Sequence, residues 1–510
     1  MKKAFLFYAA IATFISVGSA LSQQAKLTGK LDSLVKKYDI AGLSVSVAKD
    51  SKIVYTQGFG KRDIGRNLPV NDSTKFRIAS ISKFFTSIAV MQLYEQGKLK
   101  LDEDVSRYLG YTFRNPKYPS DSITLRRILS HTAGIRDGDT YSDFLSATAS
   151  SVTLSIKDLL VPGGKYYSAS MWSDNNSAKL NYFTYSNVNF GVAGTIVEKI
   201  SGERFDIYCR KHIFAPLGLT CSYNIQDLPD INNLAVLYRK PNGVWTAQYD
   251  QYNGVKPTPR NLSGYVPGTN GFIFGPQGGL RVSSSDLAIV DIAIMNGGIL
   301  NGNRILNDTT VLGFLKSNWI FSGGNGDTMG GEFKEYAFGN HRTTDLIHGE
   351  VLYGHPGEAY GLISDMYFSK DNSFAITMAI SGGTWGSGKY SAWYNVEEDI
   401  YQACYAELNN LVTGVDKGDL ILPGKYELKQ NYPNPFNPTS KIDFSLPKDS
   451  HVTIKVYNSI GREVSTLINA EIKKGEHQAV VDGSLLSSGV YFYNIKADGF
   501  CQTRKMVVLK

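Results

Sequence analysis

The sequence is poor in the residues that build metal centres and disulfide frameworks. Its 510 residues include four cysteines and seven histidines, with no Cys-x-x-Cys pair and no His-Glu-x-x-His motif. The zinc sites that such spacings create are therefore not predicted. Cys209 and Cys221 are close enough in sequence to form a disulfide in an exported protein, but nothing in their spacing requires one.

Long apolar runs are absent except at the N-terminus. There Lys2 and Lys3 precede the segment AFLFYAAIATFISVG, and small residues follow at Ala20 and Ser22. A positive start, a short apolar run and a small-residue cleavage site are typical of a signal peptide, which we place at residues 1–22. A buried first helix is the alternative. No later stretch reaches the roughly eighteen apolar residues of a spanning helix, so we expect an exported chain without a transmembrane segment after cleavage.

The central part of the chain also lacks an excess of one charge. Lys and Arg number 53 against 46 Asp and Glu, which gives a net charge of +7. Lys2 and Lys3 contribute +2 and residues 425–510 contribute +4, which leaves +1 for the middle, without a basic stripe. A nucleic-acid partner is therefore not supported.

The chain is too long for one ordinary domain, and its pattern changes near residue 415. Before that point, helix-like and strand-like segments alternate with glycine-rich loops. Prolines and turn-forming residues then mark a linker at residues 409–428. Short β-rich runs follow: IDFSL, HVTIKVYN, HQAVVD, GVYFYNIKA and QTRKMVVLK. We therefore predict a small antiparallel β-sandwich in residues 429–510.

This C-terminal segment carries a distinctive set of motifs, namely YPNPFNP at residues 432–438, GREV at 461–464, GVYF at 489–492 and RKM at 504–506. With them it resembles the C-terminal sorting domain of the type IX secretion system. The resemblance implies that the type IX machinery is a partner. It also implies that the protein is secreted from, or displayed on the outer surface of, a Gram-negative bacterium, often with removal of the tail. A carbohydrate-binding or structural β-module is the alternative.

A serine and a lysine three residues apart begin an apolar, helix-like run, FRIASISKFFTSIAVMQLYEQGKL. Residues three apart on a helix share a face, so the Lys83 amine can reach the Ser80 hydroxyl. A serine becomes a nucleophile when an adjacent base takes its proton, and a desolvated lysine can be that base. The spacing alone is weak evidence, because it recurs at Ser33, Ser46 and Ser445. A helix-capping serine is the alternative.

Tyr185 and Asn187 precede another helix-like segment and can point into a common cleft. Tyr185 could share a proton with Lys83 or pass one to a leaving group. Asn187 could bind a substrate amide and hold Lys83 in place. A simple helix cap at Ser186 or Asn187 is the alternative. His131, in a turn after a predicted helix, is interpreted as structural.

The sequence pattern predicts antiparallel strands in two regions. The alternation in residues 41–63 predicts a hairpin with its turn at residues 49–51. Further on, His355-Pro356-Gly357 opens the first of several adjacent strands, and Gly357 would let a substrate backbone lie close to it. Considered alone, His355 is more often a surface histidine than a functional one.

The order and spacing of these three motifs resemble the serine β-lactamase and penicillin-binding-protein superfamily. The best match is the class C β-lactamase-related branch, which includes esterases and D-amino-acid peptidases. The resemblance covers roughly residues 26–408, taken as the hydrolase domain, and extends to further segments: FRIA at 76–79, LSHTAG at 129–134, IFAPLG at 213–218, GGL at 278–280, DLA at 286–288 and NGG at 296–298.

The resemblance implies an α/β (α+β) fold in which helices flank an antiparallel sheet and an all-helical subregion lies across the cleft. It also implies roles for the motif residues. Ser80 is the acylated nucleophile, Lys83 and Tyr185 transfer protons, and Asn187 positions the substrate. Backbone N–H groups of Ser80 and Glu358 form the oxyanion hole. No cofactor is required, since all these groups belong to the protein.

The third motif departs from the family pattern. His355 stands where many members have the lysine of a Lys-Thr-Gly strand, and it is mostly neutral at pH 7. Pro356 has neither a hydroxyl nor a backbone N–H. Glu358 adds negative charge at the mouth of the cleft, and like charges repel strongly near a protein surface. We therefore expect neutral esters, or amides and peptides of D-amino acids, to be better substrates than penicillins.

Two other functions remain open at this point. The first is a β-lactamase or D-Ala-D-Ala carboxypeptidase, because the polar loops from about residue 224 to residue 274 shape the cleft. The second is a surface protein that keeps the fold for binding without turnover. The intact set of Ser80, Lys83 and Tyr185 argues against the second function.

Overall fold

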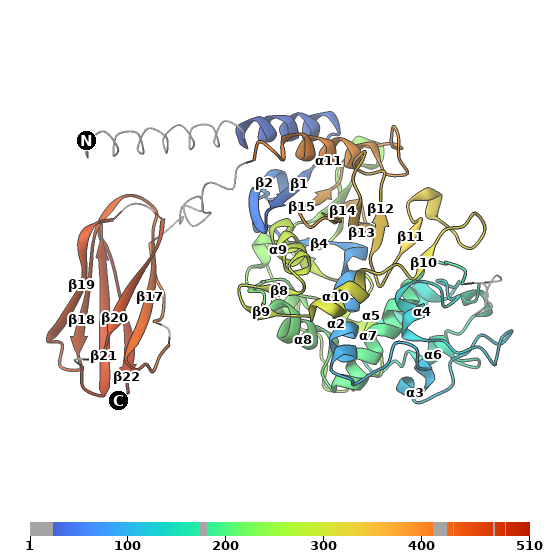
Figure 1. Ribbon diagram of the computed structural model, residues 1–510, viewed down its shortest axis with the longest axis horizontal. Helices are drawn as coiled ribbons and strands as arrows, with labels where there is room; N and C mark the ends of the chain where they lie inside the picture. Colours follow the sequence, from blue (N-terminus) through green and yellow to red (C-terminus); the bar gives the residue numbers. More distant parts are fainter. Residues whose placement is uncertain are drawn as a thin grey trace. The chain divides into compact units, whose positions relative to one another are not determined.

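The computed structural model describes residues 24–173, 181–411, 426–431, 433–472, 475–484 and 486–509 (Figure 1). They form two compact units, which divide between Leu411 and Val412. The predicted signal peptide at 1–22 and most of the predicted linker lie outside the described residues. Within the described ranges no helix is both long enough and apolar enough to cross a membrane.

The larger unit is built on a nine-stranded sheet whose neighbouring strands are all antiparallel. The strand order is β10-β11-β12-β13-β14-β15-β1-β2-β3. Their bounds are β1 Gly42–Lys49, β2 Lys52–Asp63, β3 Leu68–Pro69, β10 Trp319–Ile320, β11 Glu335–Tyr336, β12 His341–Thr343, β13 Leu352–Ala359, β14 Leu362–Ser369 and β15 Phe374–Ser381. Three two-stranded ribbons accompany the sheet, formed by β4 Phe76–Arg77 with β7 Arg281–Val282, β5 Leu237–Arg239 with β6 Thr246–Tyr249, and β8 Ile299–Leu300 with β9 Asn303–Arg304.

The predicted hairpin is confirmed as β1 and β2. Asp50 and Ser51 form its two-residue turn, and both have positive φ, 50° and 60°. Such a turn matches the right-handed twist of the flanking strands. The strands predicted after His355 are also confirmed, as β13, β14 and β15.

Helices cover both faces of the sheet, as Figure 1 shows. Leu43, Val45 and Val47 of β1 share a core with the helix at residues 24–37 and with α11, Asn395–Glu407. On the opposite face, Ser44 and Ser46 form side-chain hydrogen bonds of 2.7 and 2.8 Å with Ser284 at the start of α9, Ser284–Met295. The short hydroxyl side chains let this helix pack directly against the sheet.

The remaining helices form the predicted all-helical subregion and its connections. Their bounds are α2 Ser82–Glu95, α3 Val105–Leu109, α4 Leu125–Leu129, α5 Tyr141–Ser150, α6 Lys157–Leu160, α7 Asn187–Ser201, α8 Phe205–Cys209 and α10 Asp308–Leu315.

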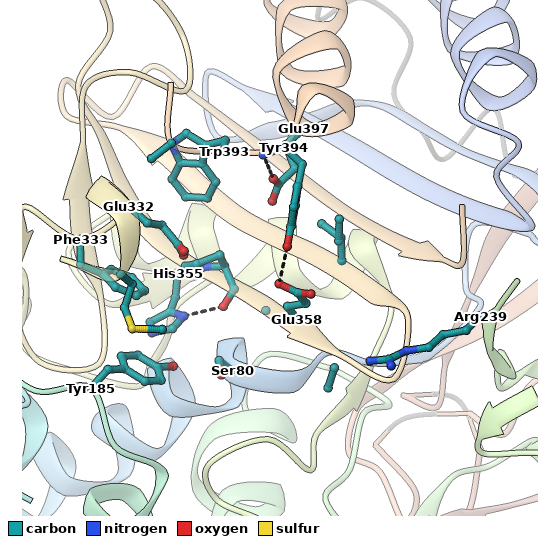
Figure 2. A pocket seen from close by; sticks show the side chains of 16 residues that line it. Ser80, Tyr185, Arg239, Glu332, Phe333, His355, Glu358, Trp393, Tyr394 and Glu397 are labelled. Carbon is teal, nitrogen blue, oxygen red and sulfur yellow. Dashed lines mark hydrogen bonds between the residues drawn. The ribbon is translucent and has the colours of Figure 1, made fainter. Parts of the chain in front are cut away.

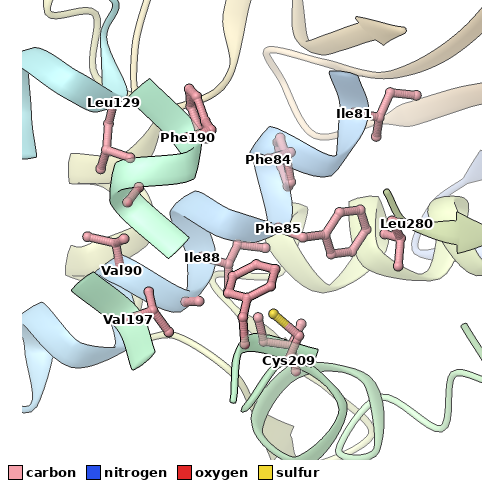
Figure 3. Packing of buried hydrophobic residues seen from close by; sticks show 14 of the residues in the cluster. Ile81, Phe84, Phe85, Ile88, Val90, Leu129, Phe190, Val197, Cys209 and Leu280 are labelled. Atoms are coloured by element: carbon pink, nitrogen blue, oxygen red, sulfur yellow. The ribbon is translucent and has the colours of Figure 1, made fainter. Parts of the chain in front are cut away.

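Helix α2 lies at the centre of the largest apolar core. Every residue from Ser82 to Leu93 is buried, which is the pattern of a helix surrounded by other elements on all sides. Figure 3 shows Phe84, Ile88 and Val90 of α2 packed among side chains of α4, α7 and α8. The helix that follows the predicted nucleophile is therefore fixed by packing along its whole length.

The smaller unit is the predicted C-terminal sandwich. One sheet has the order β16-β17-β20 and the other β19-β18-β21-β22. Their bounds are β16 Glu427–Leu428, β17 Thr439–Leu446, β18 Ser450–Asn458, β19 Glu463–Ile472, β20 Gly475–Asp482, β21 Gly489–Ala497 and β22 Phe500–Val508. Strand β19 was not among the predicted runs. It is an edge strand with no fully buried residue, so its sequence lacks the apolar alternation that marks the other strands.

The disulfide that the sequence left open does not form. Cys209, Cys221 and Cys404 are buried free thiols, and Cys501 is an exposed one. Burial raises the pKa of Cys209 and Cys221 well above the usual thiol range, so both stay protonated and unreactive.

Candidate active site

Ser80 lies in a short 3-10 turn, Ala79–Ile81, immediately before α2. Ala79 has a positive φ of 47°, a conformation that costs energy for any residue with a side chain and is often found at functional sites. Strand β14 holds this turn, since the Ser364 hydroxyl donates to the Ile78 carbonyl at 3.0 Å. The backbone of the nucleophile is thus set by the sheet on one side and by α2 on the other.

Lys83, one turn into α2, is fully buried and contacts three oxygen atoms. Its Nζ lies 2.8 Å from Ser80 Oγ, 2.9 Å from Asn187 Oδ1 and 3.0 Å from the Gln277 carbonyl. Burial lowers the pKa of Lys83 to about 7, although the negative charge of Asp137 opposes the change. The amine is therefore divided between its charged and neutral forms near pH 7.

These contacts direct the lone pair of the neutral amine. The Gln277 carbonyl can only accept, and the amide oxygen of Asn187 also accepts, so the two together take both N–H groups of an uncharged Lys83. The lone pair is left facing Ser80 Oγ. In this form Lys83 is arranged to accept the hydroxyl proton of Ser80.

Tyr185 lies between two rings on the other side of Ser80. His131 stacks on it at 4.3 Å between centroids, and Phe333 stacks at 5.3 Å with the planes 6° apart. Burial raises the pKa of Tyr185, while a hydrogen bond with Ser80 lowers it to a smaller extent. The phenol therefore remains protonated and can donate a hydrogen bond towards the Ser80 oxygen.

Asn187 is held by an aspartate that the sequence analysis did not identify. Its Nδ2 donates to Asp137 Oδ2 at 2.7 Å, which turns Oδ1 towards Lys83. The other oxygen of Asp137 accepts the backbone N–H groups of Asn187 and Val188 at 2.8 and 3.0 Å. Asp137 thus caps α7 and orients the amide. It lies in the loop sequence GIRDGDT, where no spacing marks it.

His131 has the structural position that was expected. It is buried with a positive φ of 57°, and its Nδ1 accepts the backbone N–H of Ser186 at 3.1 Å. Burial lowers its pKa well below the usual histidine range. The neutral ring of His131 therefore stacks on Tyr185 and accepts a hydrogen bond from the backbone next to it. These two contacts hold the phenol in position.

His355 on β13 is fully buried, so the alternative of a surface histidine is wrong. Its Nδ1 lies 2.6 Å from the Pro356 carbonyl, and its Nε2 lies 2.8 Å from the Tyr336 hydroxyl. Because the carbonyl can only accept, Nδ1 carries the proton and Nε2 accepts from Tyr336. Burial lowers the pKa of His355 well below the usual range, so it supplies no positive charge.

Gly357 lies against the turn of the predicted nucleophile, Ser80. A Cβ at this position would come within 2.3 Å of the Ile78 carbonyl oxygen and 3.2 Å of the Ser80 nitrogen. The sequence predicted that this glycine admits a substrate backbone. The structure shows in addition that it admits the turn that carries Ser80.

A cavity of about 460 Å³ opens beside Ser80, shown in Figure 2. Five of the seven predicted site residues line it, and Lys83 and Asn187 lie directly behind Ser80. Its other walls come from the segments around residues 329–333 and 392–397, which the sequence analysis had not assigned to the site. The lining residues are Ser80, Tyr185, Arg239, Met329, Glu332, Phe333, His355, Pro356, Gly357, Glu358, Ala359, Ile363, Ala392, Trp393, Tyr394 and Glu397.

Known proteins share this architecture. Residues 27–399 match the family model described as Beta-lactamase, and residues 430–509 match the one described as Secretion system C-terminal sorting domain. Protein flp of Staphylococcus aureus (strain MRSA252) is 26% identical over 186 residues, which are 36% of this chain and 35% of that protein. The chain therefore spans about a third of the length of this curated relative.

Two solved structures share the fold at lower identity. The octameric penicillin-binding protein homologue from Pyrococcus abyssi gives a TM-score of 0.56 at 18% identity, covering 95% of this chain and 96% of that one. The D-amino acid amidase from Ochrobactrum anthropi SV3, complexed with L-phenylalanine amide, gives a TM-score of 0.55 at 20% identity. The match covers 77% of this chain and all of that one.

Proposed function

Because the chain belongs to the beta-lactamase family, we propose that it is a serine hydrolase that works through an acyl-enzyme on Ser80. The observation that carries this proposal is the position of Lys83, whose buried Nζ lies 2.8 Å from Ser80 Oγ. A base with a pKa of about 7 suits proton transfer at neutral pH. One of its three oxygen contacts is the Ser80 hydroxyl, which is the contact that proton transfer requires.

The first step is attack of Ser80 Oγ on the substrate carbonyl, with transfer of the hydroxyl proton to Lys83 Nζ. The bond to the leaving group then breaks, and Tyr185 passes a proton to the departing oxygen or nitrogen and regains one from Lys83. Water attacks the acyl-enzyme in the second half of the reaction and loses a proton to Lys83. Lys83 returns this proton to Ser80 Oγ as the acyl bond breaks, and the acid is released. Asn187 keeps Lys83 oriented through both halves.

The register of β13 supports the proposed oxyanion hole. This strand pairs with β14 along its whole length, whereas β12 pairs only with Leu352–Gly354. A proline is tolerated in a strand where its nitrogen faces away from the neighbouring strand, so the nitrogen of Pro356 faces the open edge. Alternation directs the Glu358 N–H to the same edge, beside Ser80. Together with the Ser80 N–H it can stabilise the developing oxyanion, and removal of one such donor costs roughly a hundredfold in rate.

The acidic lining of the cavity supports neutral esters, or amides and peptides of D-amino acids, as the substrate class. Glu332, Glu358 and Glu397 line it against one cationic side chain, Arg239. Such a cavity disfavours substrates with a carboxylate near the reacting carbonyl. The fold shared with a D-amino acid amidase is consistent with this choice. A β-lactamase or D-Ala-D-Ala carboxypeptidase is the second candidate.

The two predicted targeting segments support a reaction outside the cell. The sorting domain at residues 430–509 is the proposed signal for the type IX machinery, after the signal peptide at 1–22 has directed the chain across the inner membrane. The protein would act as a secreted or surface-displayed enzyme of a Gram-negative bacterium.

An activated serine reagent tests the proposal. A fluorophosphonate probe should label the wild-type protein and fail to label Ser80→Ala, whereas Ser82→Ala, which changes the neighbouring serine, keeps the label. In parallel, hydrolysis of a short-chain aryl ester should exceed hydrolysis of a chromogenic cephalosporin. Absence of labelling in the folded wild type would favour the binding protein without turnover, and a faster cephalosporin reaction would favour the second candidate.

A further inference from the structure

We propose that the cavity beside Ser80 binds substrates through a free ammonium group, held by the carboxylates of Glu332 and Glu358. The inference rests on the proposed function and adds the substrate class: esters, amides or short peptides whose acyl part carries an amine. Three observations support it, namely an unpaired carboxylate, an aromatic wall and buried acids behind them.

Glu332 is the central observation. Its carboxylate has no hydrogen-bond or ion-pair partner among the described residues, although it lies mostly buried in the cavity wall that also holds Phe333. Figure 2 shows the side chain on the same side of the cavity as His355, with Arg239 at the opposite end. A buried carboxylate is stable in its ionised form only with a compensating charge or donors, and no group in the described part of the chain supplies them at this end.

The groups around Glu332 are acidic. Burial, together with the negative charge of Glu358, raises the pKa of Glu332 to about 7. Behind it Asp365 is fully buried, with no hydrogen-bond partner for either carboxylate oxygen among the described residues. Burial and neighbouring acids raise the pKa of Asp365 and of Glu397 well above the usual range, so these two groups favour their neutral forms and supply no compensating charge. A cation that enters the cavity would offset the charge of Glu358 and favour the ionised form of Glu332.

The aromatic residues of the cavity suit the same ligand. Phe333, Trp393 and Tyr394 line the wall near the carboxylates, and the Tyr394 hydroxyl donates to Glu358 at 3.2 Å. Ring faces attract ammonium groups, most strongly where water is excluded. A wall that combines carboxylates and aromatic rings favours an organic ammonium group over a strongly hydrated metal ion.

Binding to the full-length Ser80→Ala protein tests the inference without turnover. Titration calorimetry at pH 7 compares D-phenylalaninamide with N-acetyl-D-phenylalaninamide, and the L-enantiomers are measured in the same way. We expect the free amine to bind at least about tenfold more tightly, since hydrogen bonds to charged groups contribute more than neutral ones. Glu332→Gln should remove most of that preference. Glu358→Gln, a change at an exposed position, should reduce it without any risk to the core.

Glu471→Gln is the matched control, because it removes the same charge from an exposed position on β19 and should leave the preference unchanged. Equal binding of the two amides, or a preference that survives both cavity substitutions, would overturn the inference. So would displacement of the amine by millimolar Ca²⁺ or Mg²⁺, because the carboxylates would then form a metal site.

Hydrolysis of a neutral aryl ester by the protein with Ser80 intact separates this inference from the proposed function. Ester hydrolysis without a preference for amines would overturn the ammonium site alone. Selective amine binding without any hydrolysis would support the ammonium site and overturn the serine hydrolase.

Discussion

Lys83 contacts three neutral oxygen atoms and no carboxylate among the described residues. Its protonation state therefore depends mainly on burial, which favours the neutral amine. The negative charge of Asp137, which lies beyond the amide of Asn187, raises the pKa of Lys83 and so opposes the effect of burial. The reactivity of Ser80 is thus adjusted by a residue two contacts away.

This balance predicts the pH dependence of the wild type. The pKa of Lys83 is lowered in the folded protein to about 7, so the active, neutral form predominates above that pH and is lost below it. The kcat/KM for a neutral aryl ester should therefore rise with pH through about 7 and then level off. A stopped-rate assay across this range measures the curve. A rate that does not change through the window would contradict the role of Lys83 as the base.

Asp137→Asn should move that curve. Loss of the negative charge removes the interaction that raises the pKa of Lys83, so the rising limb should shift to lower pH. Because the carboxamide keeps only one acceptor oxygen, either the Asn187 amide or the start of α7 loses its acceptor, and kcat should fall roughly ten- to a hundredfold. Asp143→Asn, an exposed change on α5, is the control. If kcat falls but the rising part of the pH–rate curve stays at the same pH, Asp137 supports only the backbone.

At the scale of elements, the site is the meeting point of one turn, one helix end and one strand edge. The turn at Ala79–Ile81 carries Ser80, the start of α7 carries Asn187, and β13 passes the turn at its unpaired edge. Gly357 is where β13 and the turn come closest. Small shifts between these elements would alter the site without changing any reacting side chain.

Gly357→Ala is the test at this scale. Its Cβ would lie 2.3 Å from a backbone oxygen of the nucleophile turn, so the turn or the strand must move. We expect loss of at least about tenfold in kcat/KM and destabilisation of about 1–3 kcal/mol. Gly313→Ala in α10, where no atom lies within 4 Å of the new Cβ, should instead be neutral or stabilise by about 0.5–1 kcal/mol. Thermal unfolding and ester hydrolysis measure both effects, and equal behaviour of the two variants would refute the packing argument.

At the scale of the whole molecule, the proposed active site and the sorting domain belong to separate units. The apolar core of the sandwich contains residues from 428 onwards only, and the two large cores of the catalytic unit end at Leu411. Each unit therefore has the buried surface that independent folding requires.

Removal of residues 412–510 should accordingly leave the catalytic unit intact. We expect kcat/KM on the aryl ester to stay within about twofold of the full chain, while export beyond the outer membrane is lost. Activity of purified protein and of cell-free medium measures the two effects. Ser80→Ala in the full chain provides the reverse control, with export retained and hydrolysis lost. A truncated protein that unfolds would contradict the independence of the units.

The local patterns of the sequence predicted much of the fold and of the candidate site. Alternation identified the hairpin of β1 and β2, and the three-residue spacing brought Lys83 to Ser80, because both depend on neighbours along the chain. Strand β19 was missed because its exposed edge position leaves no such pattern. The two family resemblances, to the beta-lactamase family and to the sorting domain, are confirmed by the matches to residues 27–399 and 430–509.

The sequence by itself thus determined the fold class, the two families and the residues of the three motifs. Only the tertiary structure decided the environment of those residues. The Gln277 carbonyl meets Lys83 across 194 positions of the chain, and Glu332 joins the cavity from a loop with no recognisable motif. The acidity of the cavity and the pKa of Lys83 depend on burial and on distances between remote segments. No local pattern encodes these quantities, because packing creates them.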